Sequence, residues 1–233
     1  MHRYTHATLD STNDEARRLI AAWQQHPGAS TLAPEPFAVI ADAQTAGRGT
    51  KGRQWVSPPG AGLYLSVVHP VGTVQTALPL TTNYTVAAGV ACVEALQALY
   101  GLTVQIKPVN DLMHDGRKLG GILTEGIIQD NRLQCVITGI GINLLKADRP
   151  VKKHTPVSLE ELTNQQEFPK DPLVDAITNR LNHWYAHLAD SPTDTLPDEL
   201  DLLYHSFLRP RPPSAVASDT LPRKGAGNIS HPV

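Results

Sequence analysis

The stretch Gly47-Arg48-Gly49-Thr50-Lys51-Gly52 decides between two classes of fold, because it formally matches the G-x-G-x-x-G motif of dinucleotide-binding domains. In such a domain a helix begins directly after the loop, and an acidic residue that binds the ribose follows further along the chain. Here the loop runs into Ser57-Pro58-Pro59-Gly60, which cannot open a helix, and neither Asp nor Glu occurs between Asp42 and Glu94. The loop also lacks the Lys-Ser/Thr ending of a P-loop. The sequence therefore excludes both of these nucleotide-binding motifs.

The segments on either side of this loop predict an α+β fold. Short apolar runs are typical of buried strands, and apolar residues at helical spacing indicate helices. The expected strands are 37–41, 63–68, 104–107, 121–125, 126–129 and 133–138, with a hairpin turn at Asp130-Asn131, and the expected helices are 11–25, 82–99 and 171–188. Because helices and strands do not alternate strictly, we expect a mixed sheet flanked by helices.

Composition narrows the class of protein further. The chain has 233 residues, of which 41% are hydrophobic and 18% charged, so it can build one sizeable core. Its formal net charge of −2 argues against a strongly basic nucleic-acid-binding protein. No signal segment or membrane-spanning run is apparent, and the only cysteines are Cys92 and Cys135. These features predict a protein of the reducing cytoplasm.

Proline marks a change in composition near Leu208. Beyond this residue, five prolines mix with Ser, Gly and Ala, and no hydrophobic period continues. We therefore expect one folded domain over residues 1–208 and a Pro-rich, disordered tail over residues 209–233.

Cations gather in and after the glycine loop. Arg48, Lys51 and Arg53 lie among three glycines, which let a backbone approach a ligand closely, and cations neutralise phosphate or carboxylate. A solvated basic turn explains the loop alone equally well. Lys118 directly precedes a strongly apolar run, where it is either a surface residue with a buried stem or a cation held over a pocket.

Six segments together resemble the biotin–protein ligases. They occur in the order and with the spacing of that family, over roughly residues 5–190, and six motifs in register are hard to explain by chance. The segments are Ser11-Thr12-Asn13, Gln44-Thr45-Ala46-Gly47-Arg48-Gly49, Gly52-Arg53-Gln54-Trp55-Val56-Ser57-Pro58, Lys107 with Asn110-Asp111, Arg117-Lys118-Leu119-Gly120-Gly121-Ile122-Leu123-Thr124-Glu125, and Gly139-Ile140-Gly141-Ile142-Asn143.

The resemblance implies a catalytic domain over residues 1–208, with the α+β fold shared by lipoate ligases and class II aminoacyl-tRNA synthetases. It also implies a two-step activity, with ATP and biotin as substrates and Mg²⁺ as the metal ion. In the first step biotin and ATP give biotinyl-5′-AMP and pyrophosphate. In the second, a lysine of the biotin carboxyl carrier domain of a carboxylase, such as acetyl-CoA carboxylase, takes the biotinyl group.

The resemblance also assigns roles to individual residues. Arg48 and Lys118 would be catalytic, because the reaction brings two anions together and needs positioning and charge neutralisation. Asp111 would bind Mg²⁺, since carboxylate oxygens suit this ion. The biotin-binding residues would be Ser11, Thr12, Asn13, Gln44, Arg48, Gly49, Thr50, Lys118 and Gly121, and the ATP-binding residues would be Arg48, Arg53, Trp55, Lys118 and Asn143.

The sequence departs from the family in several places. Pro108 stands where members usually have Trp, and Thr50 stands at a position that is often basic. Many members carry a small β-barrel after the catalytic domain, and the Pro-rich tail takes its place here. Some relatives begin with a DNA-binding domain, which is not apparent in this chain, so we expect no binding to DNA or to membranes. The sequence does not decide between a monomer and a homodimer.

Two other functions fit parts of the sequence. A lipoate or octanoyl transferase shares the fold and a lysine, but the glycine loop with Trp55 and the Lys-x-x-Asn-Asp motif favour biotin. A non-catalytic protein that binds biotin or its adenylate is the other alternative, because Pro108 and the missing β-barrel alter the family pattern. The presence of both Arg48 and Lys118 favours the enzyme.

Overall fold

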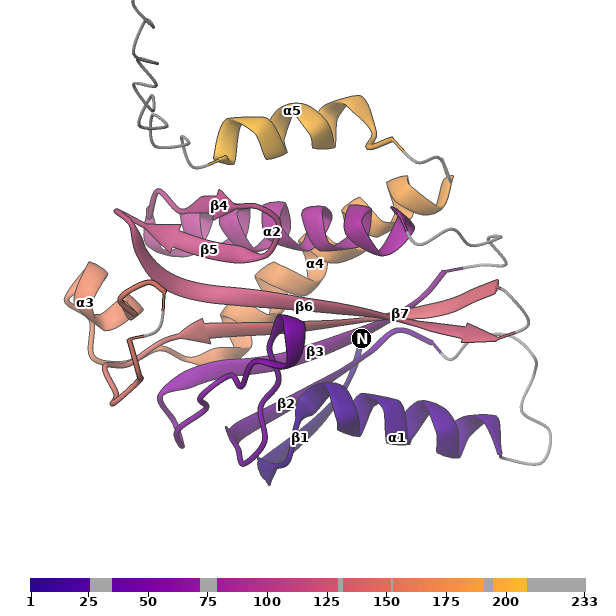
Figure 1. The fold of residues 1–233 in the computed structure, drawn as a ribbon, viewed down its shortest axis with the longest axis horizontal. Coiled ribbons are helices and arrows are strands. Elements are labelled where there is room, and N and C mark those ends of the chain that lie inside the picture. Colours follow the sequence, from indigo (N-terminus) through magenta and orange to yellow (C-terminus); the bar gives the residue numbers. More distant parts are fainter. Residues whose placement is uncertain (26–34, 72–78, 130–131, 152, 191–194, 209–233) are drawn as a thin grey trace, which may run out of the picture.

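A seven-stranded mixed sheet forms the centre of the molecule in a computed structural model, which describes residues 1–25, 35–71, 79–129, 132–151, 153–190 and 195–208 (Figure 1). In spatial order the strands are β1-β2-β3-β7-β6-β5-β4. β1 pairs in parallel with β2, and the other neighbouring strands are antiparallel. The strands are β1 (His2–Leu9), β2 (Phe37–Gln44), β3 (Gly62–Pro70), β4 (Gln105–Lys107), β5 (Asp111–His114), β6 (Arg117–Gln129) and β7 (Arg132–Asn143).

Helices cover both faces of this sheet. On one face lies α1 (Thr12–Gln24), whose Ala16 and Ile20 pack against residues such as Val39 and Ile137 of the strands. The larger core lies on the opposite face, beneath α2 (Pro79–Tyr100), α4 (Lys170–Asp190) and α5 (Asp198–Phe207) (Figure 1). Two short helices, η1 (Thr50–Gly52) and α3 (Leu159–Thr163), lie in the connections.

The start of α1 is fixed by a side-chain cap. Ser11 has an extended backbone, and its Oγ accepts a hydrogen bond from the amide of Asp14 at 3.4 Å. Asp14 and Glu15 in the first turn favour the positive end of the helix dipole. Since β1 ends at Leu9, the chain turns sharply at this cap. Thr12 and Asn13, the first two residues of α1, are buried there against the sheet.

The predicted fold class is confirmed: the sheet is mixed and flanked by helices. The sequence missed β1, β5, α3 and α5, and it divided β6 into two strands. β1 is an edge strand with mostly exposed side chains, so it shows no apolar pattern. The expected turn at Asp130-Asn131 and the expected tail at 209–233 lie outside the described residues. Among the residues described, no helix is long and apolar enough to cross a membrane.

Candidate active site

One pocket lies where the start of α1, the glycine loop after β2 and the strands β5, β6 and β7 come together. Every site residue that the sequence suggested lines it, although these residues come from segments far apart in the chain. They are Ser11, Thr12, Asn13, Gln44, Arg48, Gly49, Thr50, Arg53, Trp55, Asp111, Lys118, Gly121 and Asn143. The structure thus brings the set together, and the role of each residue stays a prediction.

Hydrogen-bonded side chains of neutral polar residues form one end of this pocket. Gln44 Oε1 accepts from the Thr12 amide at 2.8 Å, and Gln44 Nε2 donates to Ser57 Oγ at 2.8 Å. Ser66 Oγ lies 2.8 Å from Thr12 Oγ1 and 2.6 Å from Asn13 Oδ1. Because these partners fix the rotamers, the end is preorganised for a compact ligand with both donors and acceptors.

Glycines in β7 make room for two of the pocket's side chains. A Cβ at Gly139 would stand 2.4 Å from Asn13 Oδ1, and a Cβ at Gly141 would stand 2.4 Å from Cε2 of Trp55. Both distances are far below van der Waals contact, so any larger residue would displace its neighbour. The indole of Trp55 therefore lies directly on β7, and its buried Nε1 has no hydrogen-bond partner among the described residues.

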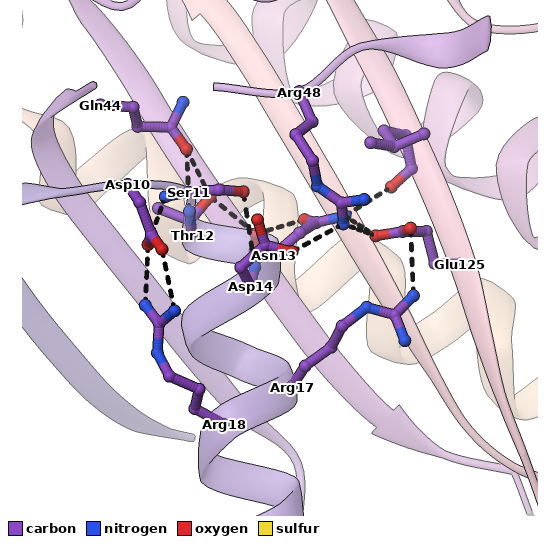
Figure 2. Close-up of polar contacts among 12 residues, drawn as sticks. Asp10, Ser11, Thr12, Asn13, Asp14, Arg17, Arg18, Gln44, Arg48 and Glu125 are labelled. Atoms are coloured by element: carbon purple, nitrogen blue, oxygen red, sulfur yellow. Dashed lines mark hydrogen bonds and ion pairs between the residues drawn. The ribbon is translucent and has the colours of Figure 1, made fainter. Parts of the chain in front are cut away.

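Arg48 reaches from the glycine loop to two carboxylates on other elements (Figure 2). Its Nη2 lies 3.0 Å from Asp14 Oδ1 on α1 and 2.5 Å from Glu125 Oε2 on β6. Glu125 also accepts from Asn13 Nδ2 at 2.7 Å and pairs with Arg17 at 3.0 Å. Burial raises the pKa of Glu125, but the Asn13 hydrogen bond and the two guanidinium groups outweigh it, so this pKa lies below its usual value.

Lys118 and Lys107 share the carboxylate of Asp111. Lys118 Nζ lies 2.5 Å from Asp111 Oδ1, and Lys107 Nζ lies 3.0 Å from Asp111 Oδ2. Burial raises the pKa of Asp111, yet Lys118 and then Lys107 lower it further, and the net shift is downward. Lys118 Nζ also lies 5.5 Å from the centroid of the Trp55 ring, within range of a cation–π interaction. Lys118 is thus held between a carboxylate and an indole, inside the pocket.

Asp111 is the residue that the sequence suggests as a Mg²⁺ ligand, and it lines the pocket. In the described ranges, no three His, Cys, Asp or Glu side chains come together as a metal site would require. Mg²⁺, however, is usually bound through one or two carboxylates together with substrate phosphates and water. The carboxylate of Asp111 is therefore the kind of ligand that suits a Mg²⁺ arriving with a nucleotide.

The side-chain amide of Asn143, a residue that lines the pocket, is bound to two backbone carbonyl groups. Its Nδ2 donates to the carbonyl oxygens of Val157, at 2.9 Å, and of Lys118, at 3.3 Å. Its Oδ1 is buried and has no partner among the described residues. Asn143 thus cannot offer an amide N–H to a phosphate without losing these bonds.

The glycine loop is folded on itself at Thr50. Arg53 Nε donates to the Thr50 carbonyl oxygen at 3.0 Å, and Arg53 Nη2 donates to Thr50 Oγ1 at 2.7 Å. Lys51, between them, has a left-handed backbone with φ of 58°. The Thr50 hydroxyl, at a position that is often basic in similar sequences, is therefore one of the two acceptors that hold Arg53.

Sequence reasoning missed the segment that closes the pocket after β7. Arg149 donates to the carbonyl oxygens of Ala61, at 2.8 Å, and Leu145, at 3.0 Å. This segment carries no periodic apolar pattern, so only its basic residues could have drawn attention to it. Of the lining residues without a predicted role, only Arg149, Pro150, Lys153, His154 and Pro156 lie outside the six quoted segments. The lining residues that lie inside those segments but received no role are Gln54, Val56, Asn110, Ile122, Leu123, Gly139, Ile140 and Gly141.

Known proteins resemble this chain in sequence. Residues 8–143 match the model of the biotin/lipoate A/B protein ligase family. The chain is 33% identical over 188 residues to the biotin–[acetyl-CoA-carboxylase] ligase of Paracoccus denitrificans, which covers 78% of this chain and 72% of that protein. It is 37% identical over 145 residues to the bifunctional ligase/repressor BirA of Bacillus subtilis. This match covers 61% of the present chain but only 40% of the Bacillus protein.

Solved structures resemble it in fold, and together with the sequence matches they decide the family. The biotin protein ligase of Leishmania major in complex with biotin has a TM-score of 0.66 and 25% identity, over 98% of this chain and 86% of that one. The Aquifex aeolicus biotin protein ligase, in complex with biotin and ATP, has a TM-score of 0.68. At 22% identity, over 89% of this chain and 78% of that one, it supports the fold alone. The chain belongs to the biotin/lipoate A/B protein ligase family.

Proposed function

We propose that this protein is an ATP-dependent biotin–protein ligase. It would activate biotin as biotinyl-5′-AMP and transfer the biotinyl group to a lysine of a biotin carboxyl carrier domain. The observation that carries the proposal is the placement of Arg48 and Lys118 in one pocket with the neutral polar end formed by Thr12, Asn13 and Gln44. Biotin is proposed as the acyl group because similar proteins are biotin–protein ligases.

The first step joins two anions. A carboxylate oxygen of biotin attacks the α-phosphorus of ATP, the bond to the bridging oxygen of pyrophosphate breaks, and a mixed anhydride forms. Biotin's carboxylate and the phosphate repel one another, so the protein must supply cations and hold the reactants in line. Arg48 and Lys118 supply these cations, while the polar end orients the neutral ring of biotin through hydrogen bonds.

The second step needs a neutral amine. The lysine amine of the carrier domain attacks the acyl carbon, AMP leaves with the electron pair of the anhydride oxygen, and the amine loses a proton to give the amide. Lys118 would stabilise charge on the departing phosphate, and its contacts with Asp111 and Trp55 support this role. A positive pocket also disfavours an ammonium group, so it lowers the pKa of an arriving lysine.

Magnesium fits this pocket only together with ATP. Asp111 would contribute its carboxylate, and the remaining ligands would come from phosphate oxygens and water. The ion would add positive charge beside the pyrophosphate that leaves.

Incubation of the purified protein with biotin, MgATP and a biotin carboxyl carrier domain tests the proposal. We expect a streptavidin-reactive carrier, formed only with ATP, and pyrophosphate release that needs biotin but no carrier. Lipoate or octanoate in place of biotin forms the comparison arm. Modification of the carrier by these acids alone would overturn the proposal in favour of a lipoate or octanoyl transferase. Binding of biotin without pyrophosphate release would favour a non-catalytic binding protein.

A further inference from the structure

Two carboxylates that do not line the pocket hold one of its cations. Asp14 and Glu125 both contact the same nitrogen, Nη2 of Arg48. Asp14 belongs to the first turn of α1, and Glu125 belongs to β6, so the contact joins the glycine loop to a helix and to the sheet (Figure 2). The function proposed above gives these two acids no role.

We propose that Asp14 and Glu125 are positioning residues that hold Arg48 over the pocket before its anionic ligand arrives. The proposal rests on the proposed function only for the identity of that ligand, which is the carboxylate of biotin. A free arginine side chain samples many rotamers, and ordering it on binding reduces affinity. Carboxylates that fix the guanidinium in advance remove most of this loss.

The geometry favours positioning over competition with the ligand. Both contacts of Arg48 use Nη2, so they do not require the donors on Nε and Nη1, and a guanidinium carries five N–H donors in all. Those other donors can bind an anion while Nη2 stays on its carboxylates. Competition would require the ligand to displace Asp14 or Glu125 from the same nitrogen.

The two carboxylates are themselves well anchored. The side chain of Glu125 is only 18% exposed, and Asn13 and Arg17 hold both its oxygens in place. Asp14 is fixed by the capped first turn of α1. The cluster has no net charge, because the two arginines Arg17 and Arg48 balance Asp14 and Glu125. It therefore fixes the orientation of the Arg48 side chain and adds little net electrostatic field.

Substitution of Asp14 gives the clearest test, because its side chain contacts Arg48 and its loss leaves the bonds of Glu125 intact. Asp14→Asn removes the charge but keeps the shape, and Asp14→Glu restores the charge. The matched control is Glu15→Gln, since Glu15 is the next residue of the same helix turn and pairs with Arg18 at 2.7 Å. Melting temperatures of all variants should stay close to that of the wild type.

Binding of biotin alone, measured by calorimetry, gives the first readout. We expect Asp14→Asn to weaken biotin about three- to fivefold, the size of a half-exposed charge contact, with Asp14→Glu partly restoring affinity and Glu15→Gln unchanged. In an Arg48→Gln background the effect of Asp14→Asn should vanish. Tighter binding in Asp14→Asn would show competition, and an unchanged affinity would show no role; either result overturns the proposal.

Limited trypsin digestion gives a second readout that needs neither ligand nor activity. Trypsin must capture the arginine side chain, so a paired Arg48 is protected. Mass spectrometry should show faster cleavage after Arg48 in ligand-free Asp14→Asn, relative to cleavage after Lys51 in the same loop. Equal ratios in Asp14→Asn and the wild type would overturn the positioning role. A wild type that protects Arg48 but binds no biotin would instead contradict the proposed function.

Discussion

Lys118 Nζ and Asp111 Oδ1 lie 2.5 Å apart, and this contact joins two neighbouring strands at the centre of the pocket. The same carboxylate also binds Lys107, but Lys107 does not line the pocket. One carboxylate therefore carries two ammonium groups, of which only Lys118 can reach a bound ligand. We therefore expect Lys118 to act on the ligand and Lys107 to act only on Asp111.

Alanine substitution of each lysine tests the difference. In Lys118→Ala the developing charge on phosphate loses a preorganised cation, a loss that typically costs ~3 kcal/mol, or roughly a hundredfold in rate. We expect pyrophosphate release to fall by about this factor while Lys107→Ala, the matched control, falls by less than about tenfold. Similar rates in a folded Lys118→Ala and the wild type would remove Lys118 from the reaction.

Gly141→Ala should move Trp55 out of its place on β7. The added methyl would stand 2.4 Å from the indole, which is sterically impossible without displacement of the ring. We expect the emission of Trp55 to shift to the red as the ring enters solvent, and ATP binding to weaken. Because Trp23 and Trp184 also emit, the same substitution in a Trp55→Phe background is the control. A spectral change that persists there would assign the shift to another tryptophan.

The burial of His69 predicts that the protein loses stability in mild acid. Its Nε2 lies 2.7 Å from Asn182 Oδ1, its ring packs edge-on against Tyr185, and its Nδ1 is buried without a partner among the described residues. Burial lowers the pKa of His69 below its usual value of about 6.5, although the Asn182 bond opposes the shift. The unfolded chain then binds the proton more readily, so the free energy of unfolding falls as the pH drops below about 6.5.

His69→Gln retains a donor for Asn182 but cannot titrate in this range. We expect the melting temperature of the wild type to drop more than that of His69→Gln between about pH 7.5 and about pH 5.5. Equal drops in both proteins would show that His69 does not contribute to the acid sensitivity.

The strands and helices that the sequence predicted are those that bury an apolar face. Strands such as 63–68 of β3 and the helix 82–99 of α2 belong to the main core, where apolar residues dominate the pattern. β1 escaped detection because it is an exposed edge strand, and β5 because only its two central residues, Leu112 and Met113, are apolar. The apolar pattern of a sequence indicates burial, so strands with few apolar residues are not detected.

The sequence predicted the site residues that belong to a motif. It did not predict the residues that hold them in position. Arg48 and Lys118 lie in motifs that carry a family signature, and the pocket contains both. The contact of Arg48 with Glu125 spans 77 positions in the chain and depends on the glycine loop lying beside β6. No local sequence pattern encodes that proximity. The same holds for Ser66, which bridges Thr12 and Asn13 from the middle of β3.

Thr50 departs from the family pattern, and its hydroxyl makes a contact that only the structure reveals. A neutral side chain at this position removes one cation from the loop that faces the ligand. Its hydroxyl, however, accepts from Arg53 Nη2 at 2.7 Å and so holds a second cation in a defined place. Thr50→Val deletes the hydroxyl with little change in volume, whereas Thr50→Ser keeps it.

If the loop retains biotinyl-5′-AMP, Arg53 contributes most when it is held near the negative phosphodiester. Loss of a hydrogen bond to an exposed charge weakens such a contact by ~0.5–1 kcal/mol, which is a few-fold in dissociation rate. We expect biotinyl-5′-AMP to leave Thr50→Val about two- to fivefold faster than the wild type, and Thr50→Ser at the wild-type rate. Stopped-flow dissociation of the purified adenylate measures these rates. Equal rates for the valine and serine variants would show that the Thr50 hydroxyl does not act through Arg53.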